Sequence, residues 1–493
     1  LDSLTIDGGV IDVDAVAALA EPLAALRQAV GDLAGALAEA DSPWLIGPAR
    51  DRLATYARRA DQATQQASAS ASAAAIGPAM LGSDTPRRYL VAFINPAEAR
   101  GTGGVMGNYA VITIDDGHME RSGFGRTTDL VNEVKDLGEV PMHLSPEFLS
   151  RYRRYGLDGE GAATSAMWSN ATMTPDMPSA AAVMRQLWEG TGHPPLDGVF
   201  LIDPYGLAGL LKTTGPITVQ AADGTETRLD STNIERFLLL DQYDADTPER
   251  SDLLEQVANA TLDAILGGRL PGPQSLAHDL APAATSGHLA GWAVRPEEEG
   301  LLRAIGMDAA LPRLDGRDGL AVVTNNASAN KIDTFLERTV RYAAQVHDGL
   351  VDATLTVTLN NTAPVTGYPD YVLGSEFLAL PSGTNRTLLT VYSPLDYSGA
   401  TLDGDATSLT TDTELGWNAY TLLLDLAPGE TRTVVLHLSG QITADDYAFV
   451  LRPQALANDD TVSIEIGGDA QLRFTGEITR RTVIDEHGVR ALR

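Results

Sequence analysis

The stretch RRYLVAFINPAEARGTGGVMGNYAVITIDDG, residues 87–117, determines the fold class of the middle of the chain. Its apolar run at 90–94 is typical of a strand that is buried on both faces. Residues 107–114 predict a second strand, which the turn residues at 115–117 end. Further along, the pattern predicts helices at 179–189, 204–213 and 248–266 and a strand at 197–202. This alternation of strands and helices predicts a layered α/β domain.

The chain on either side of this domain has a different pattern. Between residues 12 and 75, apolar residues recur at spacings of three and four, which predicts an antiparallel helical hairpin acting as a stalk. A partner-binding coiled coil is the alternative. From about residue 347, short segments alternate between apolar and polar residues, which predicts a β-sandwich. We therefore expect a hairpin over 1–79, an α/β catalytic domain over 80–346 and a β-sandwich over 347–493.

The 493-residue chain has 35 Lys and Arg against 66 Asp and Glu, which gives a formal net charge of −31. Such an acidic chain repels nucleic-acid phosphates and anionic membrane surfaces, so we expect no nucleic-acid partner. The charge favours neutral or cationic partners such as uncharged glycans. The lack of cysteine excludes thiol catalysis and thiolate metal sites. Because the chain starts at Leu1 rather than Met, we expect a trimmed chain with a possible membrane anchor outside it.

The segment 95–108 leaves one predicted strand and enters the next, and its glycines allow a close approach of the backbone. Its spacing is GxGxxxG and a strand follows, so it is not a dinucleotide-binding fingerprint. One interpretation is a tight turn in which Glu98 and Arg100 form a structural ion pair. The functional interpretation places Glu98 in a cleft at the end of the sheet, where Arg100 orients it or binds substrate.

The segment 168–178 has two prolines, which fix the loop around Asp176. One interpretation is that Asp176 caps the helix that begins near residue 179. The functional interpretation is a rigid loop that presents Asp176 and Asn170 to a ligand, with Trp168 as a platform for a sugar ring. Two polar residues after the second strand, Arg126 and Asp129, are weaker candidates.

Several common site motifs do not occur. The eight histidines show no HExxH or other metal-ligand spacing, so we expect no protein-bound catalytic metal and no cofactor. The sequence also has no GxSxG elbow and no GxxxxGK[ST] loop, which argues against an α/β-hydrolase and a P-loop NTPase.

Several motifs in order resemble those of a large uncharacterised family of envelope proteins in high-GC Gram-positive bacteria, over roughly residues 10–460. Besides the stretch at 87–117 they are SNATMTPDMPSAA, LDGVFLIDPYGLAGLLKTTGPITV, NKIDTFLER and LNNTAPVTGYPDYV. The resemblance implies an extracytoplasmic protein, secreted or membrane-anchored, with a helical stalk.

The α/β core of that family is distantly similar to LytR–CpsA–Psr proteins, which transfer glycopolymers from a polyprenyl-pyrophosphate carrier to peptidoglycan. The resemblance implies a mixed sheet with flanking helices and places Arg250 at the position of a motif arginine. The chain departs from that pattern, because the Ser-Ile-Pro-Arg-Asp segment is absent and the metal-holding Asp corresponds to Arg88. Pyrophosphate chemistry needs a cationic cluster, and much of that cluster is missing here.

We therefore predict a glycoside hydrolase or transglycosylase that acts on a neutral cell-envelope polysaccharide such as arabinan. Its carboxylate pair is Glu98 with Asp176, with Asp129 as the substitute partner. The residues expected to bind substrate are polar or aromatic: Asn95, Arg100, Asn108, Arg126, Trp168, Asn170 and Arg250. The alternatives are a phosphotransferase of the LytR–CpsA–Psr kind and a non-catalytic scaffold that binds envelope glycan.

Overall fold

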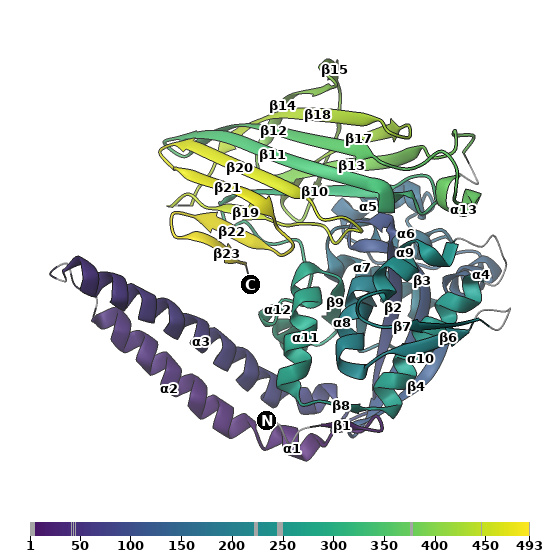
Figure 1. Cartoon of the computed structure of the whole chain (residues 1–493), viewed down its shortest axis with the longest axis horizontal. Helices are drawn as coiled ribbons and strands as arrows, with labels where there is room; N and C mark the ends of the chain where they lie inside the picture. The colour runs from purple at the N-terminus through teal and green to yellow at the C-terminus, as the bar shows by residue number, and fades with distance from the viewer. Residues whose placement is uncertain are drawn as a thin grey trace.

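A computed structural model describes residues 5–40, 42, 44, 46–220, 225–243, 250–374, 378–444 and 446–492. Three parts follow one another along the chain, namely a helical hairpin, a mixed α/β part and a pair of large β-sheets (Figure 1). The expected fold class is therefore confirmed. Within the described residues, no helix has both the length and the apolar character needed to cross a membrane.

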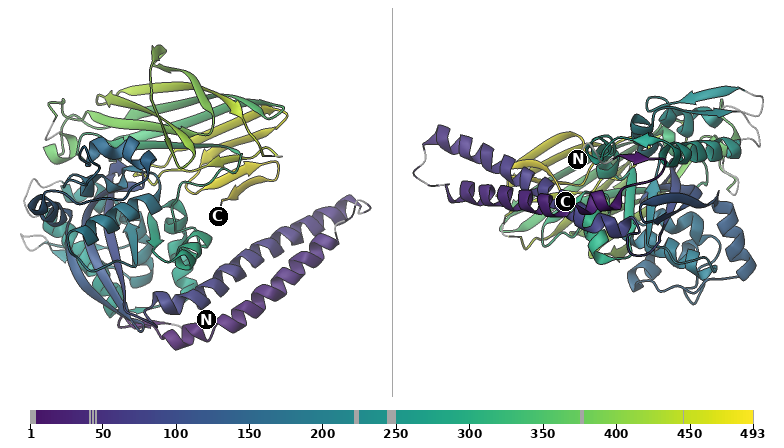
Figure 2. Two further views of the ribbon diagram at one scale, coloured as in Figure 1. Left: turned by 180° about the vertical axis from the view of Figure 1, so that it is seen from behind. Right: turned by 90° about the horizontal axis from the view of Figure 1, so that it is seen from below.

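The hairpin consists of α2 (Ala20–Glu39) and α3 (Gly47–Met80), preceded by the short α1 (Val13–Ala17). It extends as an arm away from the other two parts (Figures 1 and 2). Pro22 lies in the first turn of α2, where a proline removes no hydrogen bond of the helix. The buried residues of α3 are all alanines, Ala60, Ala67, Ala71 and Ala74. Small side chains on this face let the two helices pack closely.

The α/β part is built on a five-stranded sheet with the order β4-β3-β2-β5-β9. Its strands are β4 (His118–Arg126), β3 (Gly103–Asp115), β2 (Arg87–Arg100), β5 (Gly198–Ile202) and β9 (Leu289–Ala293). Strands β2 and β5 are parallel, whereas the other neighbours are antiparallel. The sheet is therefore mixed, as expected.

Helices cover both faces of this sheet, which is why the middle of β2, residues 90–94, is apolar on both sides. On one face, Leu90 and Val111 belong to the same buried cluster as Met184 of α7 (Met177–Gly190). On the other face, Tyr89 and Ala110 pack in a cluster with Leu262 of α10 (Arg250–Gly267). Asn108 and Arg126 of the candidate site described later lie on this second face, near α10.

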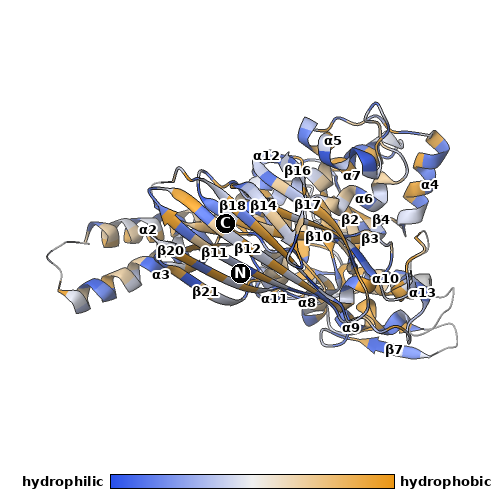
Figure 3. Ribbon diagram, turned by 90° about the horizontal axis from the view of Figure 1, so that it is seen from above, coloured by the Kyte–Doolittle hydropathy of each residue, from blue (hydrophilic) through white to orange (hydrophobic). Residues whose placement is uncertain are grey.

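The C-terminal part consists of two seven-stranded sheets. The first has the order β16 (Thr410–Glu414), β17 (Trp417–Leu426), β13 (Asn385–Ser393), β10 (Asp318–Asn326), β19 (Phe449–Leu451), β22 (Thr482–Asp485) and β23 (Gly488–Ala491). The second has the order β15 (Asp405–Thr407), β14 (Asp396–Leu402), β18 (Thr431–Gln441), β12 (Leu350–Asn361), β11 (Leu336–His347), β20 (Thr461–Gly468) and β21 (Leu472–Glu477). One buried cluster joins the two sheets, with Val322 and Val391 from the first and Val340 and Leu355 from the second. They therefore form a sandwich, and hydropathy alternates along its strands (Figure 3).

The sandwich sheets begin at Asp318, earlier in the sequence than the expected boundary at 347. All nine residues of β10 are buried, so this strand lacks the alternation of polar and apolar residues that marks a half-exposed strand. Strand β11 does alternate, and it pairs with β12 along its whole length.

The remaining elements connect or flank these layers. The helices are α4 (Thr127–Leu137), α5 (Pro146–Tyr152), α6 (Met167–Asn170), α8 (Pro204–Thr214), α9 (Ile234–Leu239), α11 (Pro273–Ser286), α12 (Pro296–Ala304) and α13 (Asp370–Leu373). Short 3-10 turns are η1 (Arg153–Tyr155), η2 (Ala171–Met173), η3 (Asp241–Tyr243) and η4 (Ile332–Phe335). Two small ribbons pair β1 (Ile6–Asp7) with β8 (Arg269–Leu270) and β6 (Ile217–Gln220) with β7 (Glu226–Leu229).

Candidate functional site

The segment 95–100 is the bulged end of β2 rather than an open loop. The pairing register of β2 with β3 shifts between Asn95 and Ala99. The Asn95 side-chain oxygen accepts a hydrogen bond from the Ala97 backbone at 2.9 Å, and its amide donates to the Tyr243 hydroxyl at 3.2 Å. Asn95 therefore holds the bulge in shape.

The glycines of the segment allow two close backbone contacts. A Cβ at Gly104 would overlap the backbone of Asn95 and Pro96, and one at Gly101 would overlap the backbone of residues 173 and 174. A Cβ at Gly107, by contrast, would lie 3.9 Å from the nearest atom, the Phe93 carbonyl oxygen.

These contacts predict different effects for two alanine substitutions in one motif. Gly104→Ala should destabilise the fold by about 1–3 kcal/mol or more, because rigid backbone rather than a movable side chain blocks the methyl group. Gly107→Ala, the matched control, should change the melting temperature little. Thermal unfolding of both variants checks this, and equal melting temperatures would contradict it.

Glu98 lies in a buried ion cluster with Lys331 and Arg100. Its carboxylate is 2.5 Å from the Lys331 Nζ and 3.1 Å from the Arg100 Nη2, and the residue is only 7% exposed. Burial alone would raise the pKa of Glu98, but the charges of Lys331 and Arg100 outweigh it and hold the pKa below its ordinary value. Glu98 is thus an ionised group with both oxygens engaged.

Asp333 extends this cluster to the backbone of β2. Its Oδ2 accepts hydrogen bonds from the Ala99 backbone at 2.9 Å and from the Asn326 amide at 2.8 Å, while its Oδ1 accepts from the Asn385 amide at 2.8 Å. We call Glu98, Arg100, Lys331 and Asp333 the interdomain cluster. It attaches the end of β2 to the sandwich through polar contacts that are shielded from water.

The side chains of Trp168 and Asn170 in the second segment, 168–178, make structural contacts within the α/β part. Trp168 is 1% exposed and belongs to the core of the α/β part, so it cannot stack on a sugar, in contrast to our expectation. The Asn170 amide donates to the carbonyl oxygens of Tyr155 and Ala166, which holds neighbouring turns together. Trp168 therefore presents no ring face to solvent, whereas Asn170 is half-buried and its expected role in binding stays a prediction.

Asp176 is the N-cap of α7. Its Oδ2 accepts from the Ser179 backbone at 3.0 Å, and its Oδ1 accepts from the Leu311 backbone at 2.9 Å. Burial raises the pKa of Asp176 above its ordinary value, although the hydrogen bonds from Ser179 and Leu311 oppose that shift. The cap interpretation from the sequence is therefore confirmed by the geometry.

The two segments pack directly against each other. The Thr102 backbone donates to the Thr172 carbonyl at 3.1 Å, and the Arg452 guanidinium donates to the carbonyls of Gly101 and Pro175. Glu98 and Asp176 nevertheless each have their own buried partners. Their use as a catalytic pair stays a prediction, which we test in the Discussion.

A second anchor joins the loop to the sandwich through Glu414 of β16. Its Oε1 accepts from the Thr174 hydroxyl at 2.6 Å, and its Oε2 lies 3.0 Å from the Arg151 Nε and accepts from the Tyr392 hydroxyl at 2.7 Å. Glu98 and Arg100 of the first segment and Thr174 of the second therefore join the α/β part to the sandwich.

A further group of polar residues, most of them accessible to solvent, lies at the end of the sheet near the N-terminal part of α10. Asn108 of β3 and Arg126 of β4 are direct partners in the strand register, so their side chains lie on one face. The Arg126 guanidinium is 3.1 Å from the Glu255 carboxylate of α10, and each of these side chains is more than one third exposed. The Arg126 backbone nitrogen donates to the Asp129 carboxylate at 2.8 Å. We call Asn108, Arg126, Asp129 and Glu255 the sheet-end site.

Asn108 distinguishes this site from an ordinary surface ion pair. The residue is 6% exposed, and its side-chain nitrogen has no hydrogen-bond partner among the residues that the structure describes. An unpaired buried donor costs about 1–3 kcal/mol, so such a group in a native fold calls for an explanation. Because this nitrogen is itself buried, a ligand would reach it only if the Asn108 side chain turned towards the sheet-end site.

Arg250 is the first residue of α10, the helix that contributes Glu255. Its side chain lies outside the described residues, so its expected role in binding stays a prediction. In the described part of the chain, no group of three or more His, Asp or Glu residues has the arrangement of a metal site.

Comparison with known proteins gives one family match. Residues 84–243 match the family described as "Protein of unknown function (DUF4012)". This range contains the strands β2, β3 and β4 and three members of the sheet-end site. The sequence has no significant match among curated proteins.

Some solved structures share part of the chain's arrangement at low similarity. The transcriptional regulator yvhJ from Bacillus subtilis is 14% identical, with 45% of this chain and 76% of that chain covered and a TM-score of 0.23. TagV from B. subtilis is 14% identical over 45% and 79% of the two chains, with a TM-score of 0.24. Protein gbs0355 from Streptococcus agalactiae is 16% identical over 45% and 74%, with a TM-score of 0.26.

Sequence reasoning missed several residues that the structure brings to these sites. Lys331 and Asp333 lie within NKIDTFLER, but nothing local pairs them with a segment more than 200 residues earlier. Glu255 follows Arg250 on the same predicted helix, where an acidic residue is ordinary. The sequence did single out Asn108, Arg126 and Asp129, and the structure brings these three together.

Proposed function

We propose that the protein is an extracytoplasmic enzyme that acts on a neutral cell-envelope polysaccharide, such as arabinan, at the sheet-end site. In hydrolysis, one carboxyl group protonates the glycosidic oxygen as its bond to the anomeric carbon breaks, and the other carboxylate takes a proton from the attacking water. Asp129 and Glu255 would divide these roles, while Asn108 and Arg126 bind sugar hydroxyls. In transglycosylation, a sugar hydroxyl replaces the water.

One observation carries this proposal, namely two solvent-accessible carboxylates that contact the same arginine beside a buried amide for which the described residues supply no partner. Asp129 contacts the backbone nitrogen of Arg126 and Glu255 contacts its guanidinium. The two carboxylates therefore contact opposite ends of one arginine. We expect the wider arrangement of inverting enzymes, about 6.5–9.5 Å, which leaves room for the attacking water.

The charge of the site supports a neutral substrate. One arginine and two carboxylates give 1 − 2 = −1, and the whole chain has a net charge of −31. A pyrophosphate group would meet repulsion here, whereas sugar hydroxyls pair with carboxylates, amides and guanidinium groups alike.

The second candidate is a glycopolymer transferase of the LytR–CpsA–Psr kind. It is favoured by the position of α10, whose first residue, Arg250, corresponds to a motif arginine of those proteins and whose Glu255 contacts Arg126. Both candidates handle an envelope glycopolymer, and they differ in the bond that is broken and in the need for a lipid-pyrophosphate donor.

Incubation with purified envelope polysaccharides, followed by chromatography of the products, tests the proposal. We expect oligosaccharides to be released from a neutral polysaccharide in the presence of EDTA and without a lipid donor. Activity that requires Mg²⁺ and a lipid-pyrophosphate donor would instead support the transferase. No product from any polysaccharide, with or without donor and metal, would contradict both enzymatic candidates and leave the glycan-binding scaffold.

A further inference from the structure

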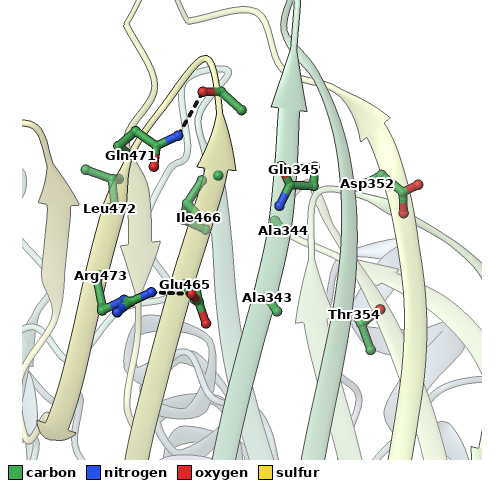
Figure 4. A pocket seen from close by; sticks show the side chains of 12 residues that line it. Ala343, Ala344, Gln345, Asp352, Thr354, Glu465, Ile466, Gln471, Leu472 and Arg473 are labelled. Atoms are coloured by element: carbon green, nitrogen blue, oxygen red, sulfur yellow. Dashed lines mark hydrogen bonds and ion pairs between the residues drawn. The ribbon is translucent and has the colours of Figure 1, made fainter.

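The second sheet of the sandwich has a hollow on its outer face. The hollow has a volume of about 860 Å³, within the range of about 300–1,000 Å³ that is usual for ligand sites. Its lining comes from four neighbouring strands, β12, β11, β20 and β21 (Figure 4). Because Tyr342 and Ala344 point into the core, Ala343 and Gln345 of the same strand point outward.

Two small residues form the floor of the hollow. Ala343 pairs in register with Thr354 on one side and with Glu465 on the other, so a methyl group lies between longer side chains. One step along, Gln345 pairs with Gly467, and a Cβ at this glycine would lie only 2.7–3.1 Å from the Gln345 amide atoms. The Gln345 side chain therefore lies flat across Gly467.

The polar groups around this floor have hydrogen-bonding capacity to spare. Gln345 and Asp352 are direct register partners, both are exposed, and neither side chain bonds to another group in the described part of the chain. Glu465 and Arg473 form an ion pair across the adjacent strands, at the opposite side of the hollow (Figure 4). An amide and a carboxylate side by side offer one donor group and several acceptors to a ligand.

The charge and polarity of these groups indicate which class of ligand the hollow would bind. Asp352, Glu465 and Arg473 together give 1 − 2 = −1, so an anionic ligand would be repelled, and the accessible lining is more polar than apolar, which disfavours a lipid or a hydrophobic peptide. Adjacent hydroxyls of a sugar present alternating donors and acceptors that match the amide and the carboxylate. We propose that the hollow binds a short stretch of a neutral polysaccharide, as a second glycan site separate from the sheet-end site.

Affinity electrophoresis in native gels tests this, because a protein with a net charge of −31 migrates well and a neutral polysaccharide in the gel does not. The probes are arabinan, galactan and dextran, with polygalacturonate as the anionic control. The Glu255→Gln background prevents the probe from being degraded. We expect one or more neutral probes to retard the protein and polygalacturonate to have no effect.

Two variants test the hollow, one by filling its space and the other by removing its polar groups. Ala343→Tyr fills it with a side chain that strands accept readily, and the double variant Gln345→Ala/Asp352→Ala removes its free polar groups. Both should weaken binding at least tenfold and leave the melting temperature nearly unchanged. The control is Thr358→Ala, because Thr358 lies on the same face of β12, four residues from Thr354 and outside the hollow.

Unchanged retardation after Ala343→Tyr, retardation of the Glu255→Gln protein by polygalacturonate, or no retardation by any neutral probe would each overturn the proposal. All the proteins compared carry Glu255→Gln, so any retardation through the sheet-end site is common to them, and the difference that Ala343→Tyr makes reports on the hollow alone. Product release from short soluble oligosaccharides reports on the sheet-end site, whether or not the hollow binds a polymer.

Discussion

Glu255→Gln is expected to lower turnover of the polysaccharide by about 10²–10⁴-fold, the usual contribution of a general acid or base. The substitution keeps the shape and some of the hydrogen bonding of the side chain but removes its titratable group. Asp129→Asn should give a loss of similar size. Glu255 forms a partly exposed ion pair, and such a pair contributes about 0–1 kcal/mol to stability. The melting temperature of the Glu255→Gln protein should therefore change little.

The matched control is Glu189→Gln. Glu189 forms an ion pair with Arg185 of the same N–O distance, 3.1 Å, and of similar exposure, but on α7, which covers the opposite face of the sheet. The turnover of the Glu189→Gln protein should equal that of the wild type. A Glu255→Gln protein that keeps full turnover would remove Glu255 from the mechanism.

Glu98→Gln is expected to destabilise the fold strongly and to leave the activity of each folded molecule largely intact. The substitution leaves Lys331 and Arg100 buried without their counter-charge, and breaking a buried ion pair in this way costs about 3–5 kcal/mol. Activity and melting temperature should be measured on one preparation. Normal stability together with lost turnover would return Glu98 to the catalytic role that its sequence context suggested.

A second variant separates loss of the charge pair from loss of packing. In Glu98→Gln/Lys331→Met, the unpaired ammonium group is also removed, and Arg100 keeps the carbonyls of Ala99 and Asn326 as acceptors. The double variant should therefore be more stable than Glu98→Gln alone. If the double variant lost as much stability as Glu98→Gln and Lys331→Met lose together, the two charges would not be coupled, and the prediction would be contradicted.

The stability difference between wild type and Glu98→Gln should also depend on pH. The folded state holds the pKa of Glu98 below its unfolded value, so this carboxylate stabilises the fold above about pH 4.3. As the pH falls towards the folded pKa, the stabilisation is lost. The two melting temperatures should therefore approach each other in acid, and a constant difference down to pH 3 would contradict the ion-pair role.

The elements of the fold could largely be predicted from the sequence, because they depend on local patterns. The spacing of apolar residues in the first 80 residues was sufficient for the hairpin, and the alternation in β12 and β18 was sufficient for half-buried strands. The exception, β10, is buried on both faces. A strand in that environment carries no alternation, so its sheet can be recognised only from its partners.

The sequence also determined which residues are unusual, but not what they do. The same residue type, a carboxylate beside an arginine, occurs at Glu98 and at Asp129. At Glu98 a lysine 233 residues away completes a buried ion cluster, whereas the carboxylate of Asp129 stays exposed to water. The difference lies in burial and long-range partners, which set the cost of leaving a charge unpaired and its access to a substrate. Only the tertiary structure decides these, because no local pattern specifies which distant segments meet.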